Sequence, residues 1–251
     1  MQIVVDSLLT TYNRAGKGKT VVLLHGWGDS LASLKDIEHK LAQSFDVINV
    51  DLPGFGQTQA PSGVWGLNDY AHFIDSFLEK VGVEDVYCFI GHSNGGALLI
   101  RGLGANILKS QKLVLIASAG VRPPKTAKRL AFKVMAKTGK AATFFLPEKH
   151  KRALRKKLYG VAGSDMLVVP HLQETFKKTV RQDVQANAAR IKIPTLLIYG
   201  VSDVATPVND GEKLHKLIKK SKLKVIDGAD HYVHQQQPEL VLKFIEEFLN
   251  V

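Results

Sequence analysis

Short apolar runs alternate along the chain with longer stretches in which apolar residues recur at helical spacing. An uninterrupted apolar run such as Thr20–Leu24 is typical of a strand buried on both faces of a parallel sheet. The predicted strands are Ile3–Val5, Leu8–Tyr12, Thr20–Leu24, Asp46–Val50, Val86–Ile90, Lys112–Ala117, Thr195–Tyr199 and Leu223–Ile226. The predicted helices of the same pattern are Leu31–Gln43, Leu67–Val81, Ala97–Leu103, Asn209–Lys219 and Glu239–Leu249. This alternation predicts an α/β fold, a mostly parallel twisted sheet flanked by helices, with the first two strands as an edge hairpin.

Between the sixth and seventh predicted strands the pattern changes. The strand signals stop at Arg122-Pro-Pro124 and return only at Ile193. The helices predicted in between are Thr126–Lys137, Glu148–Tyr159, Ser164–Phe176 and Thr179–Ala189. We therefore expect a helical cap, residues 122–190, inserted after the sixth strand between the two parts of one core, residues 1–121 and 191–251.

The composition is typical of one large α/β domain with an insertion. The chain has 251 residues, of which 45% are hydrophobic, enough for a sizeable core. It has no apolar run long enough to cross a membrane and no basic leader followed by an apolar stretch, so we predict a cytoplasmic protein. The single cysteine, Cys88, excludes an internal disulfide and falls in a predicted strand, where a buried apolar role is expected.

Positive charge is concentrated in the predicted cap. The net charge is +11, and residues 121–160 contain thirteen of the 34 Lys and Arg residues but only one acid, Glu148. Three interpretations are open: solvated lysines on a lid whose apolar residues line a pocket, a face that binds an anionic membrane surface or steers an acidic substrate, and nucleic-acid binding. No nucleic-acid recognition motif accompanies the charge, so we expect no nucleic-acid partner.

The stretch Val86–Gly96 carries the strongest chemical signal. A strand breaks at Gly91-His92-Ser93-Asn94-Gly95 and is followed by a helix. G-x-S-x-G in this setting is typical of a nucleophile elbow, a sharp turn that projects the serine above the sheet edge. Glycines two positions to either side allow the strand and helix backbones to pass closely. Ser93 is therefore the candidate nucleophile.

A tetrahedral oxyanion needs two N–H donors aimed at one point. One is expected from the residue after the nucleophile, Asn94, and the other from the loop that follows Thr20–Leu24, where we place it at Trp27. Trp27 and His92 are also the residues that we expect to bind the substrate or to shape its pocket. In contrast, His25 and Asp51 are expected to fix loops by hydrogen bonds rather than to act in catalysis.

A serine nucleophile needs a base, and the base needs a carboxylate that fixes its tautomer. Both should follow strand ends at the edge where the serine lies. Asp203 follows the strand Thr195–Tyr199, and His231 follows the strand Leu223–Ile226, so we predict that they form a triad with Ser93. The neighbouring alternatives are Asp227, Asp230, His234 and, beside the serine, His92.

Together these motifs resemble the α/β-hydrolase superfamily, in its capped serine-hydrolase branch. The stretches that carry the resemblance are His25–Gly28, Asp51–Gly56, Gly91–Gly96, Tyr199–Asp203 with Pro207, and Gly228–His231. The resemblance implies the α/β-hydrolase fold and assigns the roles of nucleophile to Ser93, of general base and then acid to His231, and of orienting carboxylate to Asp203. It also implies an oxyanion hole made by the backbone N–H groups of Trp27 and Asn94, and neither a metal nor an organic cofactor.

We therefore expect a carboxylic ester hydrolase, esterase- or lipase-like, that forms an acyl-enzyme with a moderately apolar small-molecule ester and exists as a monomer or homodimer. The same triad also serves monoacylglycerol-type lipases at membranes, carbon–carbon bond hydrolases and, with little turnover, ligand-binding receptors. The elbow Gly91–Gly96 selects none of them.

Overall fold

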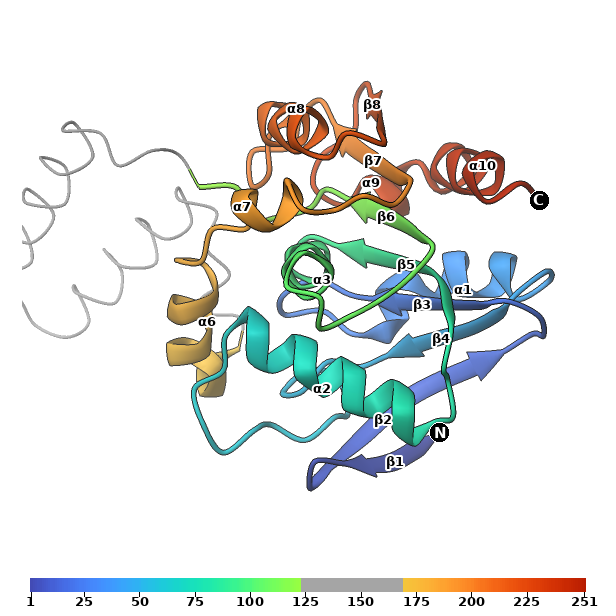
Figure 1. Cartoon of the computed structure of the whole chain (residues 1–251). Helices are drawn as coiled ribbons and strands as arrows, with labels where there is room; N and C mark the ends of the chain where they lie inside the picture. Colours follow the sequence, from blue (N-terminus) through green and yellow to red (C-terminus); the bar gives the residue numbers. More distant parts are fainter. Residues whose placement is uncertain (123–168) are drawn as a thin grey trace, which may run out of the picture.

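The computed structural model describes residues 1–122 and 169–251, which form a sheet flanked by helices on both faces (Figure 1). Its elements follow in the order β1 (Gln2–Val5), β2 (Leu8–Ala15), β3 (Thr20–Leu24), η1 (Leu31–Leu34), α1 (Lys35–Leu41), β4 (Asp46–Val50), α2 (Leu67–Lys80), β5 (Val86–His92), α3 (Asn94–Gly104), β6 (Lys112–Ile116), η3 (Pro170–Leu172), α6 (Gln173–Thr179), α7 (Gln185–Ala188), β7 (Thr195–Gly200), α8 (Val208–Leu217), β8 (Ser221–Ile226), α9 (Val233–Gln236) and α10 (Pro238–Leu249).

The sheet has eight strands in the order β1-β2-β4-β3-β5-β6-β7-β8. β1 pairs antiparallel with β2, and β2 pairs antiparallel with β4, while the pairings from β4 to β8 are parallel. Leu24 pairs with Gly91, and His92 pairs with Ile116, so β3, β5 and β6 end at one edge of the sheet. The prediction of a mostly parallel α/β sheet with an edge hairpin is confirmed.

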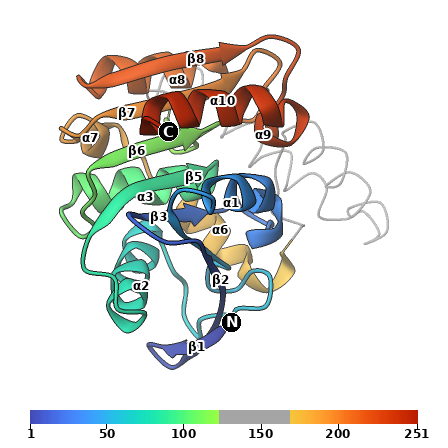
Figure 2. The ribbon, with the colours of Figure 1, turned by 90° about the vertical axis from the view of Figure 1, so that its right-hand side faces the viewer.

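Alternate residues of each central strand face two separate cores. On β3, Val22 and Leu24 face the core that contains residues of α2, α3, α7 and α8, whereas Val21 and Leu23 face the core with residues of α1, α9 and α10. Figure 2 shows α1 and α10 lying over this second face of the sheet. Because both faces are buried, the central strands are uninterrupted apolar runs in the sequence.

The chain returns to the sheet through η3, α6 and α7, and here one prediction is wrong. The expected helix Thr179–Ala189 begins only at Gln185, because residues 180–181 form a turn and residues 182–184 are irregular. The backbone N–H of Val184 donates to the carbonyl oxygen of Gly120 at 3.0 Å, and the side chain of Gln182 accepts from the backbone N–H of Leu67 at 2.7 Å. These tertiary bonds hold the stretch against the body of the protein.

Most of the predicted cap lies outside the described residues. This applies to the predicted helices Thr126–Lys137 and Glu148–Tyr159 and to all but the first two residues of the basic segment 121–160. Within residues 1–122 and 169–251, no helix combines the length and the apolar character needed to cross a bilayer.

Candidate active site

Ser93 occupies a strained turn between β5 and α3. Its backbone has φ 49° and ψ −111°, a region that residues with a side chain seldom adopt. The turn is held from β6, because the Ser93 N–H donates to the Ile116 carbonyl and the Ser93 carbonyl accepts from the N–H of Ala119, both at 3.0 Å. A Cβ atom on Gly91 would lie 2.7 Å from the Gly96 nitrogen, and one on Gly95 would lie 2.3 Å from the Leu24 oxygen. The close backbone approach therefore explains the glycines of the motif.

The three residues predicted as a triad lie in one hydrogen-bonded chain. The Ser93 Oγ lies 2.9 Å from His231 Nε2, and His231 Nδ1 lies 2.9 Å from Asp203 Oδ2. An ionised carboxylate only accepts hydrogen bonds, so the Nδ1–H donates to Asp203 and Nε2 is free to accept from the serine hydroxyl. The arrangement can withdraw a proton from Ser93, which is the chemical requirement for nucleophilic attack.

Asp203 is held in its ionised form by its surroundings. The residue is only 3% exposed, and its carboxylate accepts four hydrogen bonds, from the backbone N–H groups of Ala205 and Thr206, the Thr206 hydroxyl and His231. Burial raises the pKa of Asp203, but the hydrogen bonds from His231 and Thr206 outweigh it, and the net pKa is lowered. Asp203 therefore offers His231 a permanent negative charge.

Sequence reasoning missed Thr206. Its Oγ1 lies 2.6 Å from Asp203 Oδ2 and 3.1 Å from His231 Nδ1. A signal was available, since the carboxylate of an aspartate in a turn commonly accepts from the backbone two or three residues further on, as Asp203 does from Ala205 and Thr206. That local pattern places a hydroxyl at position 206 beside the carboxylate.

His92 lies behind the base. Its ring is 1% exposed, lies 4.4 Å from the ring of His234 between centroids, and its Nε2 lies 3.1 Å from the backbone oxygen of His231. Burial, and then the charges of His234 and His231, lower the pKa of His92 well below its ordinary value, so the neutral ring donates its Nε2–H to that oxygen. This buried placement favours a role in holding the base loop rather than the direct substrate contact that we expected.

The alternatives to the base and its carboxylate occupy other positions. Asp227 is exposed, and Asp230 stabilises the turn by accepting from the backbone N–H of Tyr232 at 2.9 Å. His234 is buried in α9, where burial and the charge of His231 lower its pKa to about 4. None of the three has a hydrogen bond to Ser93 among the described residues.

The loop after β3 passes directly over the elbow. A Cβ atom on Gly26 would lie 3.3 Å from the Ser93 Cβ, so the backbone of the next residue, Trp27, runs beside the serine. Within residues 1–122 and 169–251 the Trp27 N–H has no acceptor, and Asn94 is the first residue of α3, where the N–H points out of the helix. Both backbone donors predicted for an oxyanion are thus available next to Ser93.

The side chains of the same two residues carry buried donors that lack partners. The Trp27 Nε1 and the Asn94 Nδ2 are buried and have no hydrogen-bond acceptor in the described part of the chain. The indole is packed edge-on against Phe55, with ring centroids 4.8 Å apart, and against Phe176 of α6 at 5.0 Å. Unsatisfied buried donors are rare and costly, so each of these two beside Ser93 calls for an acceptor, either a water molecule or a group of the substrate.

The structural roles expected for His25 and Asp51 are confirmed. His25 is fully buried; its Nδ1 lies 2.7 Å from the Gly26 oxygen and its Nε2 accepts from the Leu52 N–H at 3.0 Å. Burial lowers the pKa of His25, which keeps the ring neutral. Asp51 accepts from the backbone N–H groups of Leu31 and Gln57 at 2.7 and 2.8 Å. Both residues tie the loops after β3 and β4 together.

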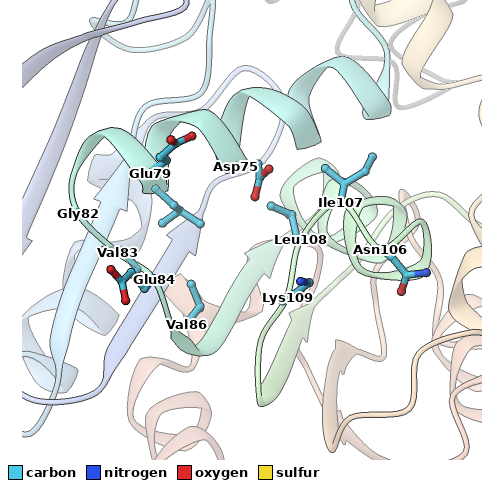
Figure 3. Close-up of a pocket in the computed structure, with 11 residues that line it drawn as sticks. Asp75, Glu79, Gly82, Val83, Glu84, Val86, Asn106, Ile107, Leu108 and Lys109 are labelled. Atoms are coloured by element: carbon cyan, nitrogen blue, oxygen red, sulfur yellow. The ribbon is translucent and has the colours of Figure 1, made fainter.

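A separate open pocket of about 550 Å³ lies at the other end of β5 (Figure 3). Val86, the first residue of β5, lines it, whereas Ser93 follows the last residue of the strand. The carboxylates of Asp75, Glu79 and Glu84 and the amine of Lys109 surround it. This pocket is therefore remote from the triad.

Among residues 1–122 and 169–251, no group of three or more His, Cys, Asp or Glu side chains is arranged to hold a metal ion.

Comparison with known proteins agrees with the fold. The model of a family described as "Alpha/beta hydrolase family" matches residues 21–244. A 2-hydroxy-6-oxo-6-(2'-aminophenyl)hexa-2,4-dienoic acid hydrolase of Metapseudomonas resinovorans is 26% identical over 92% of this chain and 83% of its own. A pimeloyl-[acyl-carrier protein] methyl ester esterase of Neisseria meningitidis is 26% identical over 92% of this chain and 93% of its own. The crystal structure of a bacterial membrane phospholipase A superposes with a TM-score of 0.78 and 21% identity, covering 100% of this chain and 85% of that one.

Proposed function

The chain belongs to the α/β-hydrolase family, and from that premise we propose that it is a serine-dependent hydrolase of carboxylic esters that acts through an acyl-enzyme. The observation that carries the proposal is the chain of two 2.9 Å hydrogen bonds from Ser93 through His231 to Asp203. These contacts join a hydroxyl, an imidazole in the required tautomer and an ionised carboxylate, in the chain order of this fold.

In the acylation step, Ser93 Oγ attacks the ester carbonyl carbon while His231 Nε2 takes the hydroxyl proton. The Nδ1–H stays on His231 and remains bonded to Asp203, whose negative charge stabilises the imidazolium that forms. When the tetrahedral intermediate collapses, the C–O bond to the alcohol breaks. His231 then returns the proton to the leaving oxygen, and the acyl group remains on Ser93.

The developing oxyanion is stabilised by the backbone N–H groups of Trp27 and Asn94. Asn94 begins α3 directly after the nucleophile, and Trp27 follows Gly26, whose backbone approaches the Ser93 side chain. The positive end of α3 adds to the field at the same point. Loss of one such donor typically lowers kcat by about 10²- to 10³-fold.

Deacylation repeats the sequence with water as the nucleophile. The water oxygen attacks the acyl carbon while His231 Nε2 takes one of its protons. The bond between the acyl carbon and Ser93 Oγ then breaks, and the serine oxygen recovers the proton from His231. The His231 side chain is 17% exposed, so the base is not sealed off from solvent.

Carbon–carbon bond hydrolysis is the second candidate. It is favoured by the relative at 26% identity, whose name gives a dienoic acid as substrate, and by a 2-hydroxy-6-oxo-2,4-heptadienoate hydrolase of Pseudomonas putida at 24% identity over 98% of this chain. A methyl ester esterase is equally similar to this chain. The two activities use the same serine, base and acid, so only a test with both kinds of substrate distinguishes them.

Hydrolysis of p-nitrophenyl esters, from acetate to palmitate, tests the proposal, with Ser93→Ala as the control. We expect turnover by the wild-type protein, none by the variant, and labelling of Ser93 by a fluorophosphonate. The acyl chain length that is hydrolysed fastest distinguishes a small-ester esterase from a lipase. A different result would favour the carbon–carbon hydrolase. In that case Ser93 is labelled and 2-hydroxy-6-oxo-2,4-heptadienoate is cleaved, but the p-nitrophenyl esters are not hydrolysed.

A further inference from the structure

The Thr206 hydroxyl contacts one residue in each of the loops that follow β6, β7 and β8, the last three strands of the sheet. Its Oγ1 lies 2.6 Å from Asp203 Oδ2 in the loop after β7, 3.1 Å from His231 Nδ1 after β8, and 3.0 Å from the carbonyl oxygen of Ala117 after β6. The residue is 6% exposed, so solvent does not compete strongly for these contacts. No other side chain in the described ranges contacts both Asp203 and His231 by hydrogen bonds.

The single hydroxyl hydrogen of Thr206 has two acceptors within reach. The 2.6 Å separation from Asp203 is typical of a hydroxyl that donates to a carboxylate, whereas the Ala117 oxygen is neutral and more distant at 3.0 Å. The hydrogen is therefore directed to Asp203. As a result, the same carboxylate oxygen receives the Thr206 O–H and the His231 Nδ1–H.

We propose that Thr206 is a positioning residue for the hydrolysis, whose hydroxyl fixes Asp203 Oδ2 where it receives the His231 Nδ1–H while the Ser93 proton is transferred. The inference rests on the proposed function. No proton leaves Thr206 in this role; its bond keeps the imidazole oriented with Nε2 toward Ser93.

The loop after β6 holds the Ala117 carbonyl, a hydrogen-bond acceptor near Thr206, in a fixed position. Ala117 has φ 44°, in the left-handed region, and its N–H donates to the Ile198 oxygen at 2.8 Å. The next residue, Ser118, accepts from the buried Tyr199 hydroxyl at 2.9 Å. A strained backbone held by these bonds keeps the Ala117 carbonyl beside Thr206, which limits the movement of the threonine side chain.

The titration of Asp203 distinguishes a positioning role from a merely structural one. The Thr206 hydrogen bonds contribute to the lowered pKa of Asp203, so a variant without the hydroxyl has a higher Asp203 pKa. The ¹³C resonance of the Asp203 carboxylate then titrates at higher pH than in the wild type. The other ionisable groups that interact with Asp203 in the described residues are His231 and Tyr199.

The test compares Thr206→Val, Thr206→Ser and the control Thr195→Val with the wild type. Thr195 is another buried threonine whose hydroxyl donates to a backbone oxygen, that of Ile193, but it lies at the opposite end of β7. Four quantities are measured: kcat/KM for a p-nitrophenyl ester, the rate of Ser93 labelling by a fluorophosphonate, the pH titration of the Asp203 carboxylate by ¹³C NMR, and the NMR resonance of the His231 Nδ1 proton. Melting temperatures show whether each variant is folded.

We expect Thr206→Val to lose about 10- to 100-fold in kcat/KM, as for removal of a hydrogen bond to a charged group. Its Asp203 carboxylate should titrate at higher pH and its imidazole resonance should shift, while Thr206→Ser and Thr195→Val keep the wild-type titration and resonance. If Thr206→Val does not fold, Thr206→Ala is the second variant without a hydroxyl. An unchanged Asp203 titration and an unchanged imidazole resonance in the folded variant would overturn the positioning role. A wild-type protein that neither hydrolyses esters nor labels at Ser93 would instead contradict the proposed function.

Discussion

His92 Nε2 donates to the backbone oxygen of His231 across 3.1 Å, so the residue before the candidate nucleophile holds the loop that carries the candidate base. The contact also depends on Gly26, because a Cβ atom there would lie 2.8 Å from His92 Nδ1. One buried imidazole thus links the turn at Ser93, the loop after β3 and the loop that carries His231.

His92→Phe should reduce kcat by about fivefold, because it keeps the aromatic ring but removes one hydrogen bond of about 1 kcal/mol that positions His231. The matched control is His234→Phe, which makes the same replacement in the neighbouring ring and leaves the His92 bond intact. Ester hydrolysis and the melting temperature are measured for both variants. An equal loss of activity in the two variants would show that ring packing, and not the hydrogen bond, sustains His231.

Asp203→Asn tests the electrostatics of the site through stability as well as activity. The folded-state pKa of Asp203 is lowered, so the unfolded chain binds more protons and the carboxylate stabilises the fold at neutral pH. That stabilisation is present above the ordinary aspartate pKa of about 4 and is lost as the pH falls through the lower folded pKa.

Urea unfolding of wild type and Asp203→Asn between pH 7 and pH 3 gives the measurement. At pH 7 we expect the variant to be less stable by about 2 kcal/mol, since hydrogen bonds to a charged acceptor are lost. The difference should shrink below about pH 4. Activity should fall by about 10⁴-fold, because the amide favours the wrong tautomer of the base. A stability difference that does not change with pH would contradict an ionised Asp203.

The sheet and the positions of the reactive residues could be predicted from the sequence because both depend on local patterns. β3 and β4 match their predicted bounds, since strands buried on both faces are continuous apolar runs. Ser93, Asp203 and His231 each follow a strand end, and parallel strands bring these ends to one edge. Topology alone therefore brings the three residues together.

What could not be predicted depends on contacts between distant segments. α7 begins later than predicted because the hydrogen bond from the Val184 N–H to the Gly120 carbonyl overrides local helix preference. The burial of His92 behind His231 results from a contact across 139 positions of sequence. Thr206 touches the Ala117 carbonyl, 89 positions earlier, which no spacing rule relates to it.

Gly95→Ala should be strongly destabilising. The Cβ atom would lie 2.3 Å from the backbone oxygen of Leu24 and 2.7 Å from that of His25, neither of which can move without displacing β3. We expect a loss of about 3 kcal/mol in the free energy of unfolding. Gly63→Ala is the control, since nothing lies within 4 Å of its Cβ position, and it should change stability by less than about 0.5 kcal/mol. Urea denaturation gives the free energy of unfolding of both variants. Equal values would contradict the close approach of α3 to β3.

Asn94→Leu should make the protein more stable and less active. The Asn94 side chain is buried and its Nδ2 has no acceptor among the described residues, so replacement by an apolar side chain of similar size removes a desolvation penalty of about 1 kcal/mol. A donor retained at such a cost beside the candidate nucleophile is best explained if the substrate or the transition state accepts its hydrogen bond, since natural proteins commonly lose stability at functional sites. The backbone N–H at position 94 is unaffected by the replacement, so any loss of kcat/KM reports the side chain. We expect a higher melting temperature and about a tenfold lower kcat/KM for the preferred ester. A variant that gains stability and keeps full activity would show that the Asn94 amide does not take part in the reaction.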